Sequence, residues 1–255
     1  MEYQVIKGIL FDKDGTLIDF NAVWGAAAGP ALERFLAAYC REGREQVQKR
    51  LMEQIGIHGD RIDPEGAFAW MSFGEIAEVV WDFLEKEPAC RLPEDSEAGR
   101  QELLERLKSE FYLEAVEKRT YYPTFTDVKK LFRMLTEELG MQVGLVTTDT
   151  LDSARACLNT MGASPYITFW GADDGSLPLK PDGRLGELAT RQWNLRPEEL
   201  VIVGDTPNDM RFAHNCGAFA LGVLSGTGRR EDMEDSADDL IGSVAELPAW
   251  LRSRQ

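Results

Sequence analysis

The stretch Phe-Asp-Lys-Asp-Gly-Thr-Leu at residues 11–17 directly follows a short apolar run, Val-Ile-Lys-Gly-Ile-Leu-Phe at 5–11. The length and β-branched residues of that run predict a buried strand. Asp12 then projects from the strand end, and a turn at Gly15 brings Asp14 over the same place. One carboxylate can attack an electrophile while the other carries a proton. The structural alternative is a strand followed by an ordinary Asp-Gly turn.

Strand-like and helix-like segments alternate from residue 143 onward. Short apolar runs predict strands at 143–147, 166–170, 200–204 and 218–223, and a last short strand near 239–242. Helical patterns lie between them at 151–161, 184–193 and 207–215. This alternation predicts an α/β fold, a Rossmann-like parallel sheet with helices on both faces. Ligands of such sheets bind at the carboxyl ends of the strands.

The long interval between the first two strands has a different pattern. Helical patterns rich in Ala, Leu, Glu and Arg occupy 22–40, 44–55, 74–87 and 96–117, and β-like runs are absent there. An inserted helical segment explains the interval. We therefore expect a catalytic core built from residues 1–17 and 121–255, and an all-helical inserted domain over residues 18–120.

Three further groups of polar residues stand at the ends of predicted strands. Thr147 closes the strand at 143–147, Lys180 lies in the loop before Pro181, and Asp205 ends the strand at 200–204. Asp209 lies one helical turn later if a helix begins at residue 207. Oxygen ligands of this kind suit Mg²⁺. Each residue also has a purely structural interpretation. Thr147 could simply end a strand, and Lys180 could be a solvated surface lysine. Asp205 could cap the helix, with Asp209 as a first-turn acid favoured by the helix dipole.

Taken together, the four groups resemble the motifs of the haloacid dehalogenase superfamily of hydrolases. Residues 12–16 (Asp-Lys-Asp-Gly-Thr) are similar to the first motif, Thr147 to the second, Lys180 to the third, and Gly204-Asp205 with Asp209 to the fourth. The helical insert resembles the cap domain of the subgroup that includes phosphoglycolate phosphatases. The resemblance spans nearly the whole chain and implies the fold of that superfamily.

The resemblance also implies catalytic roles. Asp12 would be the nucleophile that forms an aspartyl-phosphate. Asp14 would protonate the leaving alcohol and then deprotonate the water that releases phosphate. Thr147 and Lys180 would bind the transferring phosphoryl group, and we place Thr148 beside them, although many relatives carry Asn at that position.

A metal site is implied as well. Asp12, Asp205 and the backbone carbonyl of Asp14 would hold Mg²⁺, and Asp209 would support that site. Lys13 would contribute its backbone N–H to the phosphate. A lysine and Mg²⁺ together stabilise the negative charge of a transferring phosphoryl group.

The presence of Asp14 favours a phosphatase among these relatives, because dehalogenases of the superfamily lack this second acid. We expect a Mg²⁺-dependent phosphatase that acts on a small phosphorylated metabolite, with 2-phosphoglycolate as one candidate. A phosphosugar mutase also keeps both acids and is the alternative. A phospho-accepting, receiver-like signalling protein is an alternative of another class, although its phosphorylated Asp ends a middle strand and its length is about half of this chain.

The net charge and the cysteine content limit which binding partners and which cellular location we expect. Lys plus Arg number 28 and Asp plus Glu 44, which gives a net charge of −16. Such a chain repels nucleic-acid backbones and anionic membranes, and no apolar run reaches the length of a membrane span. The four cysteines are widely spaced, which predicts buried thiols in a cytoplasmic protein. We expect a monomer or a weak homodimer that binds neither nucleic acid nor membrane.

Overall fold

The computed structural model describes residues 5–59, 61–175 and 178–254. The contacts within the chain divide it into two compact units. The first unit comprises Met1–Phe20 and Tyr121–Gln255, and the second comprises Asn21–Thr120. That the two units fold as independent domains, with the first boundary at residue 17, remains the prediction made above. Within the described residues, no helix combines the length and the apolar character that crossing a membrane requires.

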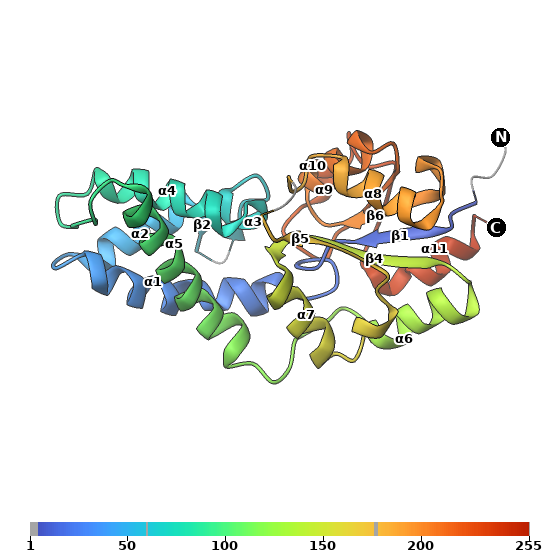
Figure 1. Ribbon diagram of the computed structural model, residues 1–255, viewed down its shortest axis with the longest axis horizontal. Helices are drawn as coiled ribbons and strands as arrows, with labels where there is room; N and C mark the ends of the chain where they lie inside the picture. The colour runs from blue at the N-terminus through green and yellow to red at the C-terminus, as the bar shows by residue number, and fades with distance from the viewer. Residues whose placement is uncertain (1–4, 60, 176–177, 255) are drawn as a thin grey trace. The chain divides into compact units, whose positions relative to one another are not determined.

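The first unit is built on a six-stranded parallel sheet in the order β5-β4-β1-β6-β7-β8 (Figure 1). This sheet and its flanking helices confirm the predicted α/β fold class. The strands are β1 (Gly8–Phe11), β4 (Gln142–Thr150), β5 (Phe169–Asp173), β6 (Leu200–Gly204), β7 (Phe219–Val223) and β8 (Asp239–Ile241).

Helices lie on both faces of this sheet, α8 and α9 on one and α6 and α7 on the other (Figure 1). The helices and helical turns of this unit are α6 (Val128–Arg133), η3 (Met134–Glu138), α7 (Leu151–Thr160), η4 (Ser164–Tyr166), α8 (Arg184–Trp193), η5 (Pro197–Glu199), α9 (Pro207–Asn215), α10 (Arg230–Met233), η6 (Val244–Glu246) and α11 (Leu247–Arg252).

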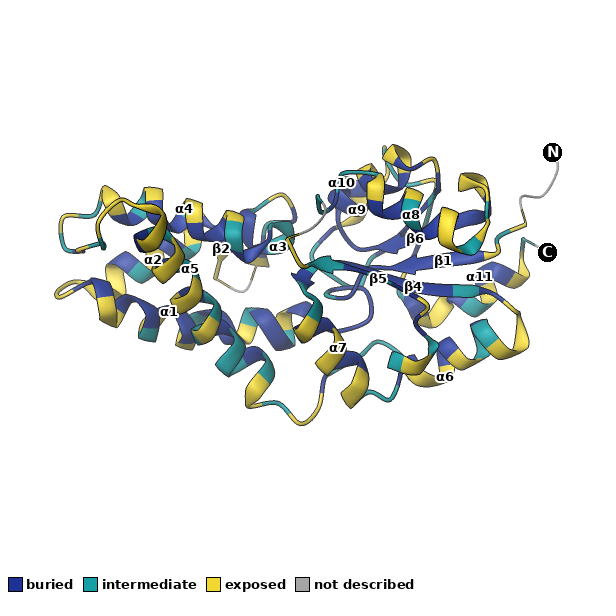
Figure 2. Ribbon diagram, in the orientation of Figure 1, coloured by how far each residue is buried: buried dark blue, intermediate teal, exposed yellow. Residues whose placement is uncertain are grey.

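The central strand β1 is buried on both of its faces (Figure 2). Leu10 belongs to an apolar cluster with residues of α8 and α9. Phe11 packs on the opposite face against Phe132 of α6, with ring centroids 5.1 Å apart. A parallel strand covered on both faces reads as a continuous apolar run. This burial explains why the strand was recognisable in the sequence.

The observed elements of this unit differ from the expected ones in several places. β5 begins at Phe169 rather than at residue 166, because Ser164–Tyr166 forms a 3₁₀ turn with a proline at its start. β4 continues to Thr150, past the expected end at residue 147. Helices α6, α10 and α11 were not predicted, and β1 begins at Gly8 rather than at residue 5.

The second unit is mainly helical. It also contains a two-residue antiparallel ladder, β2 (Ile57–His58) with β3 (Arg61–Ile62), which the expectation of an all-helical insert missed. The tight turn between the two strands includes Gly59, whose φ of 64° suits glycine. The helices and helical turns are η1 (Asn21–Gly25), α1 (Ala26–Tyr39), α2 (Arg44–Gln54), α3 (Ala67–Trp70), α4 (Phe73–Glu85), α5 (Glu97–Tyr112) and η2 (Leu113–Glu117).

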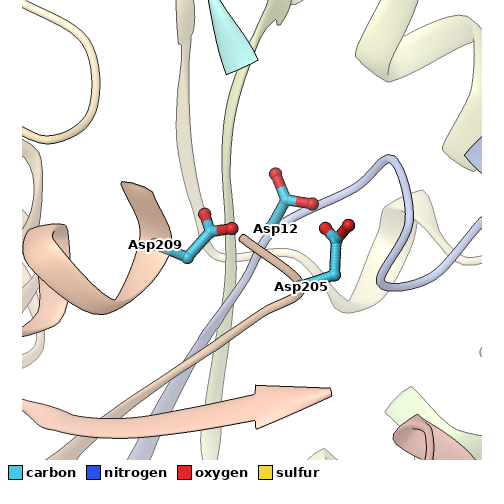
Figure 3. Close-up of side chains that lie close together, drawn as sticks. All are labelled: Asp12, Asp205 and Asp209. Carbon is cyan, nitrogen blue, oxygen red and sulfur yellow. The ribbon is translucent and has the colours of Figure 1, made fainter. Parts of the chain in front are cut away.

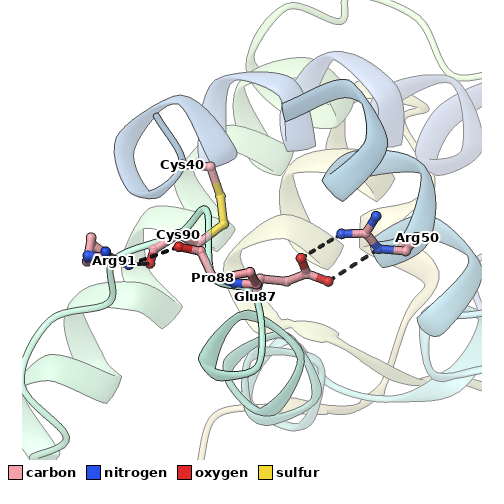
Figure 4. Close-up of a disulfide and its surroundings, with 6 residues drawn as sticks. All are labelled: Cys40, Arg50, Glu87, Pro88, Cys90 and Arg91. Carbon is pink, nitrogen blue, oxygen red and sulfur yellow. Dashed lines mark hydrogen bonds and ion pairs between the residues drawn. A yellow bond between two sulfur atoms is a disulfide. The ribbon is translucent and has the colours of Figure 1, made fainter. Parts of the chain in front are cut away.

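A disulfide joins Cys40, at the end of α1, to Cys90, after α4 (Figure 4). The prediction of four buried thiols was therefore wrong for this pair, while Cys157 and Cys216 are buried thiols as expected. The two bonded cysteines are 50 positions apart, so no local pattern indicates the pairing. The fold brings them together because the segments around Cys40 and Cys90 run antiparallel to each other.

Candidate active site

The predicted site residues lie at the carboxyl edge of the sheet. Asp12 follows β1 directly, Asp205 follows β6, and Thr147 lies in the last part of β4. β1 pairs in parallel with both β4 and β6, so these three strands end at the same edge. The alternation of strands and helices predicted this arrangement correctly.

Three carboxylates meet at this edge (Figure 3). Asp12, Asp205 and Asp209 each offer an oxygen, and the three oxygens lie within 4.8 Å of one another. All three residues are at least nine-tenths buried. Oδ2 of Asp12 is a buried oxygen without a hydrogen-bond partner. An unpartnered carboxylate oxygen inside a cluster of buried oxygen donors fits a divalent cation such as Mg²⁺.

Lys180 is held in the middle of this cluster. Its ammonium nitrogen donates to Oδ1 of Asp12 and to Oδ1 of Asp209, each at 2.6 Å. Burial by itself lowers the pKa of this lysine, but the two carboxylates more than offset that effect and raise the pKa above its ordinary value. Lys180 is therefore a buried lysine whose charged form is favoured by two carboxylates. The alternative of a solvated loop lysine was wrong.

Burial shapes the charge of the aspartates as well. It raises the pKa of the Asp12 carboxyl to about 7, with Lys180 opposing the rise and Asp209 and Asp14 adding to it. Burial is also the main cause that raises the pKa of Asp205, and the charges of Asp12 and Asp209 raise it further. Crowded buried carboxylates disfavour ionisation unless a cation balances them. The cluster thus has the electrostatics of a metal site.

Asp209 has two functions at the start of α9. Its Oδ2 accepts hydrogen bonds from the backbone N–H and the hydroxyl of Thr206, at 3.1 and 2.6 Å, which forms a capping box. Its Oδ1 binds Lys180. Thr206, rather than Asp205, caps the helix, which leaves the Asp205 carboxylate at the strand tip. The Thr-Pro-Asn-Asp sequence at 206–209 is the signal that could have identified this cap.

The loop after β7 completes the surroundings of Asp205, and sequence reasoning missed it. The backbone N–H of Thr227 donates to Oδ2 of Asp205 at 2.8 Å. The hydroxyl of Ser225 donates to the carbonyl of Gly15 at 2.9 Å. A side chain at Gly226 would overlap the Asp205 carboxylate. The Ser-Gly-Thr-Gly run at 225–228 ends another strand at the same edge, and that position was the available signal.

The turn after Asp12 has the expected glycine. Gly15 adopts a φ of +88°, and a Cβ there would overlap the Asp205 carboxylate. The turn is closed by a hydrogen bond from the Gly15 N–H to the carbonyl of Ile18 at 2.7 Å. Asp14 stands in this turn with its side chain 15% exposed, and Lys13 binds it at 3.0 Å.

The two threonines of β4 lie at the same edge. Thr147 is buried, and its hydroxyl accepts the backbone N–H of Asp149 at 3.2 Å. Thr148 is half-buried. The following helix α7 is capped by Thr150, whose hydroxyl accepts the N–H of Ser153. That Thr147 and Thr148 bind a phosphoryl group remains a prediction.

Comparison with known protein families and curated proteins finds similarity over most of the chain. The model of the haloacid dehalogenase-like hydrolases matches residues 6–217. The chain is 26% identical over 244 residues to a phosphoglycolate phosphatase of Shigella boydii serotype 4 (strain Sb227), covering 94% of this chain and 90% of that one. It is 27% identical over 240 residues to a phosphoglycolate phosphatase of Salmonella typhi, covering 93% and 89%.

Solved structures share the fold over almost the whole length. A predicted phosphoglycolate phosphatase from Haemophilus somnus 129PT superposes with a TM-score of 0.70 at 17% identity, covering 98% of this chain and 99% of that chain. A β-phosphoglucomutase from Clostridium difficile superposes with a TM-score of 0.67 at 17% identity, covering 98% and 97%. At these identities the likeness establishes the fold alone.

Proposed function

Because this chain belongs to the haloacid dehalogenase-like hydrolase family, we propose that it is a Mg²⁺-dependent phosphatase that hydrolyses a small phosphorylated metabolite through an aspartyl-phosphate. One observation carries the proposal. Lys180 lies 2.6 Å from both Asp12 and Asp209 inside a buried carboxylate cluster. A nucleophilic carboxylate beside a fixed cation is what attack on an anionic phosphate requires.

The first half-reaction transfers the phosphoryl group to Asp12. An oxygen of its carboxylate forms a bond to phosphorus while the bond between phosphorus and the ester oxygen breaks. Asp14 gives its proton to that ester oxygen, which leaves as an alcohol. Lys180 and Thr147 bind the phosphoryl oxygens during the transfer, so that the lysine balances charge that grows in the transition state.

The second half-reaction releases phosphate. A water molecule attacks the phosphorus of the aspartyl-phosphate, and Asp14, now a carboxylate, takes a proton from it. The bond between phosphorus and the Asp12 oxygen breaks, which restores the Asp12 carboxylate and the protonated Asp14. The balance is one ester and one water consumed, and one alcohol and one phosphate released.

The cluster supplies the ligands for the metal. Asp12 and Asp205 would hold Mg²⁺ together with the backbone carbonyl of Asp14, and Asp209 would support them. Mg²⁺ bound there supplies charge stabilisation for the transferring phosphoryl group. The unpartnered Oδ2 of Asp12 and the carboxylates that lie within 4.8 Å support this placement.

The relatives suggest which ester to test first. Curated relatives at 26–27% identity are phosphoglycolate phosphatases, so we propose 2-phosphoglycolate as the first candidate substrate. The phosphosugar mutase is retained as the alternative, since a β-phosphoglucomutase shares the fold. The hydrolase match favours an enzyme over the receiver-like signalling protein.

Phosphate release from a panel of small esters tests the proposal. The panel includes 2-phosphoglycolate, p-nitrophenyl phosphate and a hexose 1-phosphate, each with Mg²⁺ or with chelator. We expect turnover that needs Mg²⁺ and that falls by about 10⁴-fold or more in Asp12→Asn, because the nucleophile is lost. Asp82→Asn, the same change at an exposed position of α4, should keep wild-type turnover.

Two results would contradict the proposal. Turnover that survives in Asp12→Asn would remove the aspartyl-phosphate mechanism. Conversion of the hexose 1-phosphate into its 6-phosphate, without release of phosphate, would identify the mutase instead.

A further inference from the structure

Lys13 carries a buried charge that the proposed reaction does not use. The residue is 2% exposed, although lysine is almost never fully buried without a partner. Its ammonium group forms ion pairs with Asp149 and, at 3.0 Å, with Oδ2 of Asp14. The sequence reading gave Lys13 only a backbone contact to phosphate. The structure shows that the side chain binds two carboxylates.

Asp149 is itself held in place by the end of β4. Its Oδ1 accepts the backbone N–H of Thr150 at 2.7 Å, and its own N–H donates to the Thr147 hydroxyl at 3.2 Å. The residue is 7% exposed. Lys13 and Asp149 are 136 positions apart in the sequence. Their ion pair therefore ties the turn after β1 to the end of β4.

The buried ion pair of Lys13 and Asp149 has a desolvation cost that two apolar side chains would avoid. Removing each charge from water costs several kcal/mol, which the attraction between the charges offsets only in part. Packing alone gives no reason for a lysine at position 13. What the lysine adds is a directed contact to one oxygen of Asp14, and such a contact restricts rotation of that carboxyl group.

We propose that Lys13 and Asp149 are positioning residues that hold the Asp14 carboxyl group in the orientation for proton transfer to and from the ester oxygen. The proposal rests on the proposed phosphatase function, in which Asp14 protonates the leaving alcohol. Asp149 anchors the Lys13 ammonium to the end of β4, and Lys13 in turn holds Oδ2 of Asp14. A general acid accelerates the reaction most when its carboxyl group is held within hydrogen-bond reach of the ester oxygen.

The dependence on the leaving group tests this role. An alkyl ester such as 2-phosphoglycolate needs a proton on its leaving oxygen, whereas 2,4-dinitrophenolate departs without one. The value of kcat/KM reports the steps up to alcohol release, so the later use of Asp14 as a base does not enter it. The variant is Lys13→Met with Asp149→Asn, which removes the ion pair as a unit, so that neither of these two residues is left as an unpaired buried ion.

We expect kcat/KM to fall by about 100-fold for 2-phosphoglycolate but by less than about threefold for 2,4-dinitrophenyl phosphate. Asp14→Asn should show the same selective loss. Adding the double substitution to Asp14→Asn should change neither value further, because the group being positioned is already absent. Arg34→Met, which breaks an ion pair with Glu110 in the other unit, should leave both values at wild type.

Three results would overturn the proposal. The first is an equal loss for both esters, which would mean that Lys13 contacts the phosphate or supports the fold. The second is no loss for the alkyl ester, and the third is a further loss on the Asp14→Asn background. Failure of the proposed function looks different, because the wild-type protein would then hydrolyse neither ester, or would do so without Asp12.

Discussion

Glycines provide the space in which the buried Asp205 carboxylate fits. Side chains at Gly15 and at Gly226 would both overlap that carboxylate, and a side chain at Gly228 would overlap the Asp205 backbone carbonyl. Gly15 also adopts a φ of +88°, which non-glycine residues adopt only with strain. These residues contribute no functional group. Their role is to leave room for an acid that other residues bind.

Gly15→Ala should therefore damage both stability and activity. We expect a loss of about 1–3 kcal/mol in the free energy of unfolding, from strain and from displacement of Asp205. Mg²⁺-dependent turnover should fall with it. Urea unfolding and phosphate release measure the two effects.

Gly29→Ala is the matched control. Gly29 lies in α1, and beyond its two chain neighbours and the backbone of its own helix a Cβ there meets no atom within 4 Å. Alanine is a better helix former than glycine by about 1 kcal/mol. This variant should be unchanged or more stable. A Gly15→Ala protein as stable and active as Gly29→Ala would contradict the role given to Gly15.

The start of α9 combines a helix cap with the candidate metal site. The same Asp209 carboxylate that closes the capping box with Thr206 also binds Lys180. Local helix chemistry thereby fixes the orientation of a side chain at the site.

Thr206→Val tests this coupling. The loss of the hydroxyl should cost about 1 kcal/mol of stability. It also removes the 2.6 Å hydrogen bond to Oδ2 of Asp209, so that the carboxylate is held less firmly and turnover should fall by about tenfold. Ser96→Ala removes the equivalent cap of α5 and should cost similar stability with no effect on turnover. Equal turnover in the two variants would show that the Thr206 cap does not affect the candidate metal site.

The Glu199 carboxylate makes two interactions, one of which holds the segment before the central strand β1. Glu199 accepts the backbone N–H of Arg196 at 2.8 Å and forms an ion pair with Lys7 at 2.6 Å. The Arg196 N–H and, next, Lys7 lower the pKa of Glu199 to about 2. Its stabilising effect is therefore present above its unfolded pKa, near 4.5, and is lost as the pH falls toward 2.

Glu199→Gln should accordingly be less stable than wild type at pH 7, and the difference should shrink between pH 5 and pH 3. Urea midpoints at a series of pH values measure it. Glu138→Gln, at an exposed position, controls for the loss of one carboxylate. A difference that stays constant from pH 7 to pH 3 would show that Glu199 is not held as described.

The two units of the chain differ in how they are held together. The first buries a six-stranded sheet between helices, while the second is helical and carries the disulfide. A disulfide across 50 residues removes much of the freedom of the unfolded chain. The bond is therefore expected to stabilise the folded second unit relative to its unfolded chain.

Cys40→Ser with Cys90→Ser should lower the free energy of unfolding by about 2–4 kcal/mol. Reductant should lower the melting temperature of the wild-type protein toward that of the variant and leave the variant unchanged. Thermal unfolding with and without reductant measures this. A reductant effect of the same size on both proteins would show that the pair is not bonded.

Local pattern was enough to predict the strands, most of the helices and the edge at which the chemistry lies. The apolar run before Asp12 and the later strand ends carried that information, because side-chain periodicity and turn residues act over a few positions. Parallel strands then place their carboxyl ends together. The same reasoning predicted that Asp12, Asp205 and Asp209 lie at one edge of the sheet, and the resemblance to the superfamily added Lys180.

Contacts between distant segments were decided only by the tertiary structure. The Cys40–Cys90 bond, the link between Lys13 and Asp149, and the Thr227 N–H on Asp205 each join segments that no local pattern pairs. Residues of these types are common throughout proteins, so the sequence does not show which partner each residue contacts. Only the packing of the folded chain does. The sequence by itself thus determined which residues stand at the sheet edge. The packing of remote loops decided how each carboxylate is charged and held.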